Sequence, residues 1–237
     1  MLDSLRTEAP RYGISLTDAQ LLQFERYVTL LAEWNQRVNL VSDATADVVL
    51  RRHIIESLAL GASLREREVL RPDARIIEIG AGAGFPSLPI KISWPSIRLA
   101  LLEATAKKTA FLSAVVEALD LSDTVVVTGR AEELGHDPSL RDGFDLVLAR
   151  AVAPLPALLE LTLPFARIGG RVVAPKGSRV EEEVAASKRA LSVLGAKLFV
   201  VPLDVPGPKQ KIVVAVKQAA TPPEYPRRAG VPSKSPL

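Results

Sequence analysis

The feature that most constrains this chain is a short apolar strand that runs directly into a glycine-rich turn. Residues 75–79 read Arg-Ile-Ile-Glu-Ile, and Gly80, Gly82 and Gly84 alternate with small residues immediately after them. From this point onward, short apolar runs alternate with amphipathic segments of helical length. Strands that alternate with helices indicate βαβ units, and therefore a mostly parallel sheet covered by helices.

The alternation predicts seven strands, of which the last two have only turn residues between them. Such a short connection cannot cross over, so these two strands are predicted to pair antiparallel as a hairpin. The predicted fold is therefore α/β, a Rossmann-like, seven-stranded, mostly parallel sheet with a terminal antiparallel hairpin. The expected strands are 75–79, 97–103, 124–128, 144–149, 169–175, 197–203 and 211–217, and the expected helices are 87–93, 106–121, 155–166 and 178–194.

Two further segments flank this α/β unit. Thr17-Asp18 can cap a first helix, and a second helix is predicted over 46–60, ended by Gly61, with 61–74 as a linker. The proline-rich end is not expected to form regular structure. We predict three parts: a helical extension over 1–70, the α/β domain over 71–218, and a basic tail over 219–237.

The composition excludes several classes of site. The chain has no cysteine and two histidines, so disulfides and thiolate nucleophiles are excluded, and a zinc site is not expected. No apolar run reaches the roughly 18 residues of a membrane span, and the charged start predicts no secretory signal. We therefore expect a cytoplasmic protein without membrane contact and without a tightly held metal.

The net charge is concentrated at the end of the chain. Residues 217–237 hold four basic side chains against one acidic one, which accounts for the whole net charge of +3. A basic tail on a neutral body suggests a local contact with a polyanion. A solubilising terminus without fixed structure is the alternative.

The glycine turn is the strongest local signal for a ligand. It lies where open α/β sheets bind ligands, beyond the carboxyl end of a strand. The dinucleotide fingerprint Gly-x-Gly-x-x-Gly fails because position 85 is Phe, and no Lys-Ser or Lys-Thr follows as in a phosphate-binding loop. Glu78, two places before Gly80, suits a cationic ligand better than a pyrophosphate, so S-adenosylmethionine fits and NAD does not. A tight turn without a ligand is the alternative.

Polar residues also follow the later strands. Glu103 stands where doubly wound folds place an acceptor for ribose hydroxyls, although a helix cap is an alternative. Glu132, after Ala131, could accept from an adenine amino group or lie in a solvated loop. Arg150 follows an apolar strand and is expected in the same crevice, with a structural ion pair as the alternative. Lys176 is either a site residue or a solvated loop lysine.

Motifs spread over nearly the whole chain resemble the bacterial RsmG (GidB) family, whose members methylate N7 of a guanosine in small-subunit ribosomal RNA. The glycine loop alone indicates a class I methyltransferase, whereas its combination with Arg-Ala-Val-Ala-Pro and Tyr-Pro-Arg-Arg is specific. The chain departs from the family pattern at Glu56, Ser87 and Pro175. The motifs are Trp34-Asn35, Asn39-Leu40, Arg52-His53, Ser57-Leu58, 78–86, Lys107-Lys108, Phe111-Leu112, 129–132, Phe144-Asp145, 150–155, Lys176-Gly177, 225–230, Lys234 and Pro236-Leu237.

The resemblance implies a class I S-adenosylmethionine-dependent methyltransferase that acts on small-subunit (16S) ribosomal RNA. Whether the substrate is naked RNA or the 30S particle stays open, as do the nucleotide and the oligomeric state. The implied cofactor site comprises Gly80, Gly82, Phe85, Glu103, Ala104, Thr105, Ala131, Glu132 and Arg150. A small-molecule methyltransferase and a non-catalytic RNA-binding protein on the same fold are the alternative functions.

Guanine N7 carries a free lone pair, so methylation needs alignment of N7 with the methyl group rather than a general base. Arg150, Lys176 and Asn39 are the candidate positioning residues, and for Asn39 a role in the helix break is an equal alternative. Arg52 and His53 are candidate RNA contacts, with a half-buried structural histidine favoured for His53.

Trp34 could stack on a base, but core packing is favoured because it lies on the apolar face of the first helix. Arg227, Arg228 and Lys234 of the tail are predicted to contact RNA phosphates.

Overall fold

The computed structural model describes residues 2–205 and 210–237 and contains one seven-stranded sheet. The strand order is β3-β2-β1-β4-β5-β7-β6, in which β7 pairs antiparallel with both β5 and β6 and the other pairs are parallel. This confirms the predicted sheet and its terminal hairpin, whose turn residues 206–209 lie outside the described residues. The strands are β1 (Arg75–Ile79), β2 (Arg98–Glu103), β3 (Thr124–Thr128), β4 (Phe144–Leu148), β5 (Ala166–Lys176), β6 (Ala196–Leu203) and β7 (Gln210–Lys217).

Strand β1 lies inside the sheet, between β2 and β4, and four of its five residues are buried. Ile77 is opposite Ala100 of β2 on one side and Val147 of β4 on the other. The chain leaves β1 toward β2 and β3 and later returns to β4 on the opposite side, so the strand order reverses between β1 and β4. Ligands of open α/β sheets bind outside the carboxyl ends of the strands at such a switch point.

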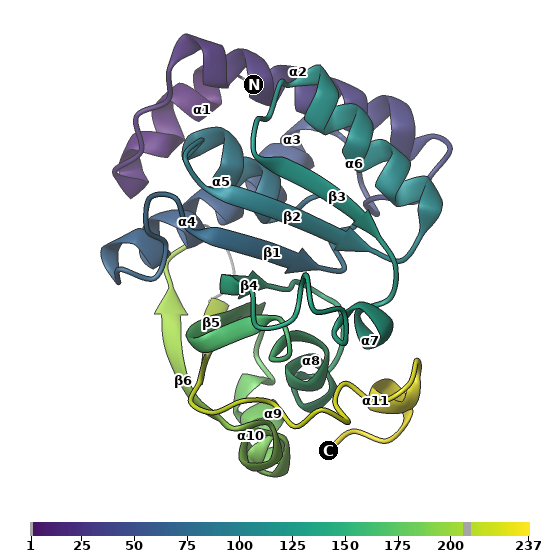
Figure 1. Cartoon of the computed structure of the whole chain (residues 1–237). Coiled ribbons are helices and arrows are strands. Elements are labelled where there is room, and N and C mark those ends of the chain that lie inside the picture. Colours follow the sequence, from purple (N-terminus) through teal and green to yellow (C-terminus); the bar gives the residue numbers. More distant parts are fainter. Residues whose placement is uncertain (1, 206–209) are drawn as a thin grey trace.

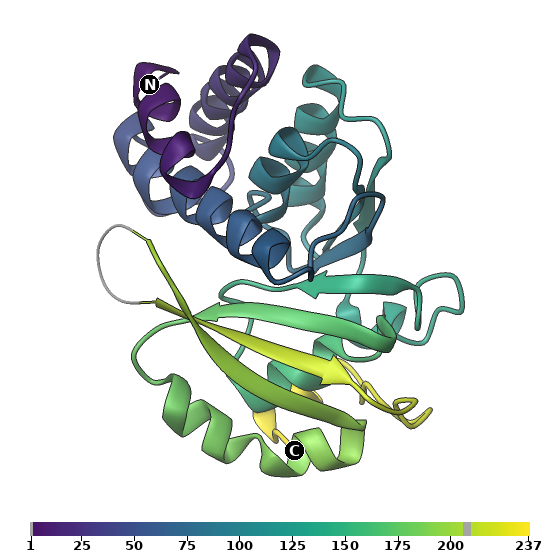
Figure 2. The ribbon, with the colours of Figure 1, turned by 90° about the vertical axis from the view of Figure 1, so that its left-hand side faces the viewer.

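Helices cover both faces of the sheet (Figures 1 and 2). The N-terminal helices, α5 and α6 share one apolar core with the first face, whereas α8, α9 and α10 pack on the second. The helices are α1 (Leu2–Glu8), η1 (Ala9–Tyr12), α2 (Asp18–Asn35), α3 (Ala46–Val48), the π-helix η2 (Val49–Ile55), α4 (Glu56–Glu66), α5 (Ser87–Ser93), α6 (Ala106–Ala118), α7 (Ala131–Leu134), α8 (Leu155–Thr162), α9 (Val180–Ala186), α10 (Lys188–Leu194) and α11 (Val231–Lys234).

The first predicted helix begins as expected. The Thr17 hydroxyl accepts from the backbone N–H of Gln20, and the Gln20 side chain accepts from the backbone N–H of Thr17. This reciprocal capping box satisfies two backbone donors that a helix start otherwise leaves without a partner. Trp34, at the other end of α2, packs edge-on against Phe111 of α6 at 5.9 Å, so it has the core role that was favoured.

The predicted end of the second helix at Gly61 is wrong. The helical segment includes the π-helix η2 and continues to Glu66, so the expected linker begins later than predicted. Gly61 is present because the Trp94 ring packs against it: a Cβ at this position would lie 2.6 Å from Cη2 of Trp94. The glycine therefore marks a close helix–helix contact rather than a helix end.

The predicted helix over 178–194 is two helices. Helices α9 and α10 meet at Ser187, whose hydroxyl donates to the backbone carbonyl of Glu183. No helix among the described residues combines the length and apolar character required to cross a membrane.

The proline-rich tail is held on the protein, contrary to the expectation that it lacks regular structure. It contains the short helix α11 and packs Tyr225 against the core beneath α8. Arg141 donates to the carbonyls of Tyr225, Thr221 and Pro222, and His136 Nε2 lies 2.7 Å from the Pro226 carbonyl oxygen. We call residues 221–230 the C-terminal strap.

Two of the four cations counted over residues 217–237 are paired with acids inside the protein. Lys217 is fully buried and pairs with Asp142. Arg227 donates from Nε and Nη2 to both carboxylate oxygens of Glu160, which is itself fully buried. The positive charge of the tail is therefore partly used within the fold, and its exposed cations are Arg228 and Lys234.

Candidate functional site

The glycine loop forms the floor of the candidate cofactor site at the carboxyl end of β1. Gly80, Gly82 and Gly84 all have positive φ, which explains the alternation of glycines in the sequence. Gly80 is also approached closely: a Cβ there would lie 2.8 Å from Cγ2 of Val152, in the segment after β4. A Cβ at Gly82 would meet only the Gly80 carbonyl oxygen, at 3.8 Å, so the loop is open above Gly82.

Glu103 is fixed beside this loop at the end of β2. Its Oε2 accepts from the backbone N–H of Gly82 at 3.0 Å, and its Oε1 accepts from the N–H of Thr105 at 2.9 Å. Each carboxylate oxygen has a second lone pair, so the group can still accept from hydroxyls of a ligand. Ala104 and Thr105, also predicted for this site, are exposed beside it.

Glu78 lies beneath the loop, and this corrects the idea that it faces a cationic ligand. It is 1% exposed, and its Oε2 accepts from the backbone N–H of Ser87 at the start of α5. Its Oε1 has no hydrogen-bond partner among the described residues. Burial raises the pKa of the Glu78 carboxyl to about 8, opposed by the hydrogen bond that it accepts from Ser87 and by the positive charge of Arg150. Glu78 therefore shapes the loop from below.

Phe85 of the loop is buried between two rings. It stacks on His53 at 4.8 Å between centroids and contacts Tyr27 at 5.3 Å. The Tyr27 hydroxyl donates to the Ala83 carbonyl at 2.5 Å. Tyr27 of α2 and His53 of the π-helix η2 thus contact the glycine loop.

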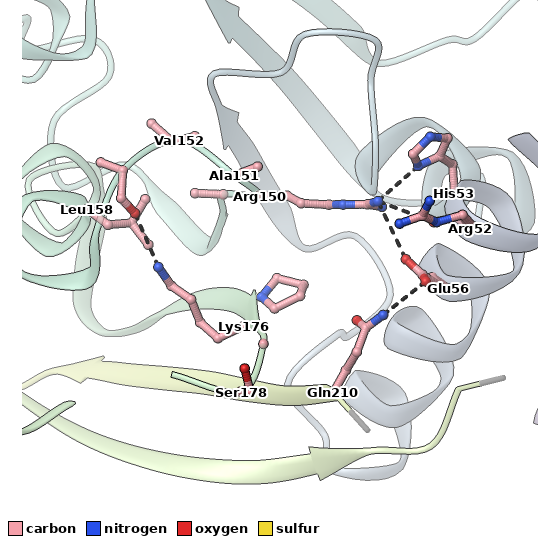
Figure 3. A pocket seen from close by; sticks show the side chains of 14 residues that line it. Arg52, His53, Glu56, Arg150, Ala151, Val152, Leu158, Lys176, Ser178 and Gln210 are labelled. Atoms are coloured by element: carbon pink, nitrogen blue, oxygen red, sulfur yellow. Dashed lines mark hydrogen bonds and ion pairs between the residues drawn. The ribbon is translucent and has the colours of Figure 1, made fainter. Parts of the chain in front are cut away.

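A cavity of about 540 Å³ opens next to the loop, beyond the carboxyl ends of β4 and β5 (Figure 3). Its wall is formed by the π-helix, the segment after β4 and the start of β7. Val152, which covers Gly80, is part of the wall, so the cavity adjoins the glycine loop. The lining residues with polar side chains are Arg52, His53, Glu56, Arg150, Lys176, Ser178 and Gln210.

Arg150 is the centre of this cavity's polar network. Its Nη2 donates to the Arg52 carbonyl at 3.2 Å, lies 2.9 Å from Nδ1 of His53, and forms an ion pair with Glu56 at 3.5 Å (Figure 3). The structural ion pair offered as the alternative for Arg150 is therefore present, in a side chain that also lines the cavity. Gln210 Nε2 donates to Glu56 Oε1 at 2.9 Å and connects the network to β7.

The charges of this network are set by burial. Desolvation, together with the positive charges of Arg150 and Arg52, lowers the pKa of His53 to about 4. His53 is therefore neutral near pH 7 and can accept from Arg150 at Nδ1. Desolvation raises the pKa of Glu56, and the nearby Arg150 guanidinium opposes this shift.

The other predicted site residues are not brought together in one place. Lys176 lines the cavity but points away from Arg150, donating to Glu183 at 2.7 Å and to the Ala153 carbonyl, so it is not a free loop lysine (Figure 3). Asn39 is exposed and outside the cavity lining. Its neighbour Asn35 stabilises the turn, because its side chain accepts from the N–H groups of residues 40 and 41.

Helix α7 connects the predicted cofactor edge with the strap. Ala131 is buried, and Glu132 accepts from the backbone N–H of Gly230 at 3.0 Å through Oε1. Arg227 is paired with Glu160, so its predicted contact with RNA stays a prediction for a side chain that is already used within the fold, whereas Arg52, Arg228 and Lys234 are exposed.

Sequence reasoning did not identify Gln210 as a site residue and noted Glu56 only as a departure from a pattern. No local motif marks Gln210, which reaches the site through the pairing of β7. Glu160 is the one acid in the apolar helix Leu155–Thr162, and this position could have predicted a buried carboxylate that needs a cationic partner. Among residues 2–205 and 210–237, no three His, Asp or Glu side chains are grouped so that they could hold a metal ion.

Comparison with known proteins identifies strong similarity over the full length. The family model described as GidB, rRNA small subunit methyltransferase G, matches residues 20–212. The ribosomal RNA small subunit methyltransferase G of Roseiflexus castenholzii is 44% identical over 238 residues, covering 100% of both chains. The protein of the same name from Chloroflexus aggregans is 42% identical and covers 95% of this chain and 94% of its own.

Solved structures show the same fold at low sequence identity. A protein described as an O-methyltransferase from Klebsiella pneumoniae superposes with a TM-score of 0.55 and 16% identity, over 81% of this chain and 90% of that one. TrmN from Thermus thermophilus has a TM-score of 0.50 and 22% identity, over 71% of this chain and 53% of that one. These similarities support the class I methyltransferase fold.

Proposed function

Because the chain belongs to the rRNA small subunit methyltransferase G (GidB) family, we propose that it transfers a methyl group from S-adenosylmethionine to N7 of a guanosine in small-subunit (16S) ribosomal RNA. The observation that carries this proposal is the arrangement of two adjoining spaces at one edge of the sheet. One is the glycine loop with Glu103 fixed beside it, and the other is the 540 Å³ cavity behind Val152. A cofactor and a purine base need two such neighbouring spaces.

The residues of the first space fit a nucleoside cofactor. The open space above Gly82 lets a ligand approach the backbone, and Glu103 keeps lone pairs for ribose hydroxyls. The proposed cofactor residues are those predicted from sequence: Gly80, Gly82, Phe85, Glu103, Ala104, Thr105, Ala131, Glu132 and Arg150. When bound, the cofactor supplies a methyl group on a positively charged sulfur.

The protein contributes alignment to this reaction. Guanine N7 is unprotonated near neutral pH and attacks without a base, so the rate depends on holding N7 in line with the methyl group. Arg150, fixed by His53 and Glu56, forms a rigid wall of the base cavity. Lys176 is the second positioning residue, and Asn39 would contribute from the exposed turn after α2 only when RNA is bound.

The proposed RNA surface surrounds the mouth of the cavity. Arg52 lines the cavity and is exposed, and Arg228 and Lys234 of the tail supply further exposed positive charge. We retain the division into a helical extension (1–70), a methyltransferase domain (71–218) and a tail (219–237), with the extension serving to hold the glycine loop. Since the substrate is ribosomal, we place the protein in the cytoplasm, acting on rRNA either free or in the 30S particle.

The proposal is tested with tritiated S-adenosylmethionine and small-subunit rRNA, naked and in 30S particles, from cells that lack this protein. We expect transfer of label to rRNA, and Glu103→Ala should weaken binding of S-adenosylhomocysteine, measured by calorimetry, by about 1–3 kcal/mol. Glu117→Ala, which removes an exposed glutamate of α6, is the matched control and should leave binding unchanged. Absence of transfer to either substrate, or transfer only to small molecules, would overturn the proposal.

A further inference from the structure

Glu56 is the one acidic side chain among the described residues that line the 540 Å³ cavity. It lies at the start of α4, where the π-helix turns into a regular α-helix, and its side chain is 16% exposed. In the aligned complex Glu56 supports Arg150 through their ion pair. A carboxylate on the wall of a base cavity can also contact the base.

The orientation of this carboxylate is fixed from two sides. Gln210 of β7 donates to Oε1 at 2.9 Å, and Arg150 lies 3.5 Å from Oε2 (Figure 3). Each oxygen retains a lone pair beyond these contacts. The guanidinium of Arg150 carries five N–H donors, and the contacts to Arg52, His53 and Glu56 all involve Nη2. The cavity therefore presents donors from Arg150 next to two acceptors of Glu56.

Alignment at N7 does not distinguish guanine from adenine, since both purines carry N7 as an acceptor. The bases differ along the opposite side of the six-membered ring. Guanine presents the acceptor O6, then the donors N1–H and N2–H₂, whereas adenine presents the donor N6–H₂ and then the acceptor N1. Proteins that bind an unstacked base read this edge by hydrogen bonds.

Resting on the proposed function, we propose that Glu56 is the specificity-determining residue for the target base, accepting hydrogen bonds from N1–H and N2–H₂ of guanine while Arg150 donates to O6. Arg150 offers a donor to O6, and the two oxygens of Glu56 offer acceptors to N1–H and N2–H₂, so all three groups of guanine are complemented. Adenine would set its N6 amino group against the guanidinium and its N1 lone pair against the carboxylate. A buried donor that faces a donor, or an acceptor that faces an acceptor, is left without a hydrogen-bond partner. Such contacts reject a ligand more strongly than a poorer fit of its shape does.

The test uses the purified full chain and RNA in which the methylated nucleotide, once mapped, is either guanosine or inosine. Inosine keeps N7, O6 and N1–H but lacks the 2-amino group, so it removes one donor to Glu56. For the unmodified protein we expect kcat/KM to be about 10- to 100-fold higher for guanosine than for inosine. In Glu56→Gln this ratio should fall to within about threefold of unity, because the amide cannot accept at both atoms.

Two variants separate this role from simple support of Arg150. Glu56→Asp keeps a carboxylate and should preserve the guanosine preference at a lower rate. Asp47→Asn removes an exposed acid of α3, ahead of the π-helix, that is paired with Arg51, and should leave both rate and ratio unchanged. Calorimetry with S-adenosylhomocysteine and thermal unfolding are measured for every variant.

The outcomes are distinguishable. If Glu56→Gln slows guanosine and inosine substrates equally and keeps their ratio, Glu56 only positions Arg150 and this inference is overturned. If the unmodified protein shows no preference for guanosine over inosine, the inference also fails while the methyltransferase function stands. If the unmodified protein transfers no methyl group to either RNA, the proposed function fails and this inference fails with it.

Discussion

Replacing Arg227 by alanine should destabilise the whole fold, because it leaves a buried carboxylate without its cation. Glu160 is 0% exposed and accepts three hydrogen bonds from Arg227, from the backbone N–H at 2.8 Å, from Nε at 2.9 Å and from Nη2 at 2.7 Å. Removing one partner of a buried ion pair typically costs about 3–5 kcal/mol. The same charge pair on the surface would contribute about 1 kcal/mol or less.

The lower end of this range applies here for two structural reasons. The backbone N–H of residue 227 still donates to Glu160 in the variant, and the Arg227 side chain is 27% exposed, so water can enter where it is removed. We therefore expect Arg227→Ala to lower the free energy of unfolding by about 3 kcal/mol. For a chain of this size, the melting temperature should fall by roughly 6–12 °C.

Urea unfolding of four proteins checks the reasoning. Arg228→Ala, which removes the neighbouring exposed arginine, should change stability by no more than about 0.5 kcal/mol. Glu160→Gln combined with Arg227→Ala should recover much of the loss, since the amide oxygen still accepts from the backbone and no buried charge remains. Equal stability of Arg227→Ala and Arg228→Ala, or a double variant no more stable than Arg227→Ala, would contradict this role of Arg227.

Three further predictions follow from other sites. Gly61→Ala should destabilise the fold by about 1–3 kcal/mol in urea unfolding, because the added Cβ meets the Trp94 ring; unchanged stability would contradict this packing. The stability of the unmodified protein should fall as pH rises from 4.5 to about 8, because folded Glu78 keeps a proton that the unfolded chain releases. Glu78→Gln should remove the contribution of Glu78 to this pH dependence. Parallel profiles of stability against pH for the two proteins would contradict this prediction. Arg228→Ala should reduce the salt slope of RNA binding by about 1, measured by filter binding between 50 and 200 mM salt, while an unchanged slope would remove Arg228 from the RNA surface.

Much of the fold was predictable because strands and glycine turns are local signals. Strand β1 and helix α5 have the predicted bounds, and the hairpin followed from a connection too short for a crossover. Gly61 was misread because a glycine at a helix end and a glycine under a packed indole look alike in sequence. Only the tertiary contact with Trp94 distinguishes the two cases.

Site residues were predictable where they directly follow a strand. They were not predictable where tertiary contacts bring them to the site from distant parts of the sequence. Glu103 and Arg150 stand at strand ends, and topology alone places them at one edge of the sheet. Gln210 reaches Glu56 across 154 positions of sequence, and no local pattern marks that contact. The ion pair between Arg227 and the buried Glu160 was missed for a similar reason, since the two residues are distant in sequence and no local pattern marks their contact.

Methylation of guanosine N7 in small-subunit rRNA by this chain would leave a nucleotide that can be located chemically. Reduction followed by aniline treatment cleaves RNA at N7-methylguanosine, and primer extension maps the cut. rRNA from cells lacking the protein, incubated with the purified chain and S-adenosylmethionine, should gain one new cleavage in the small-subunit RNA, and the Glu103→Ala protein should give less of it. Incorporation of label without any aniline-sensitive position, or cleavage confined to other RNAs, would contradict the account.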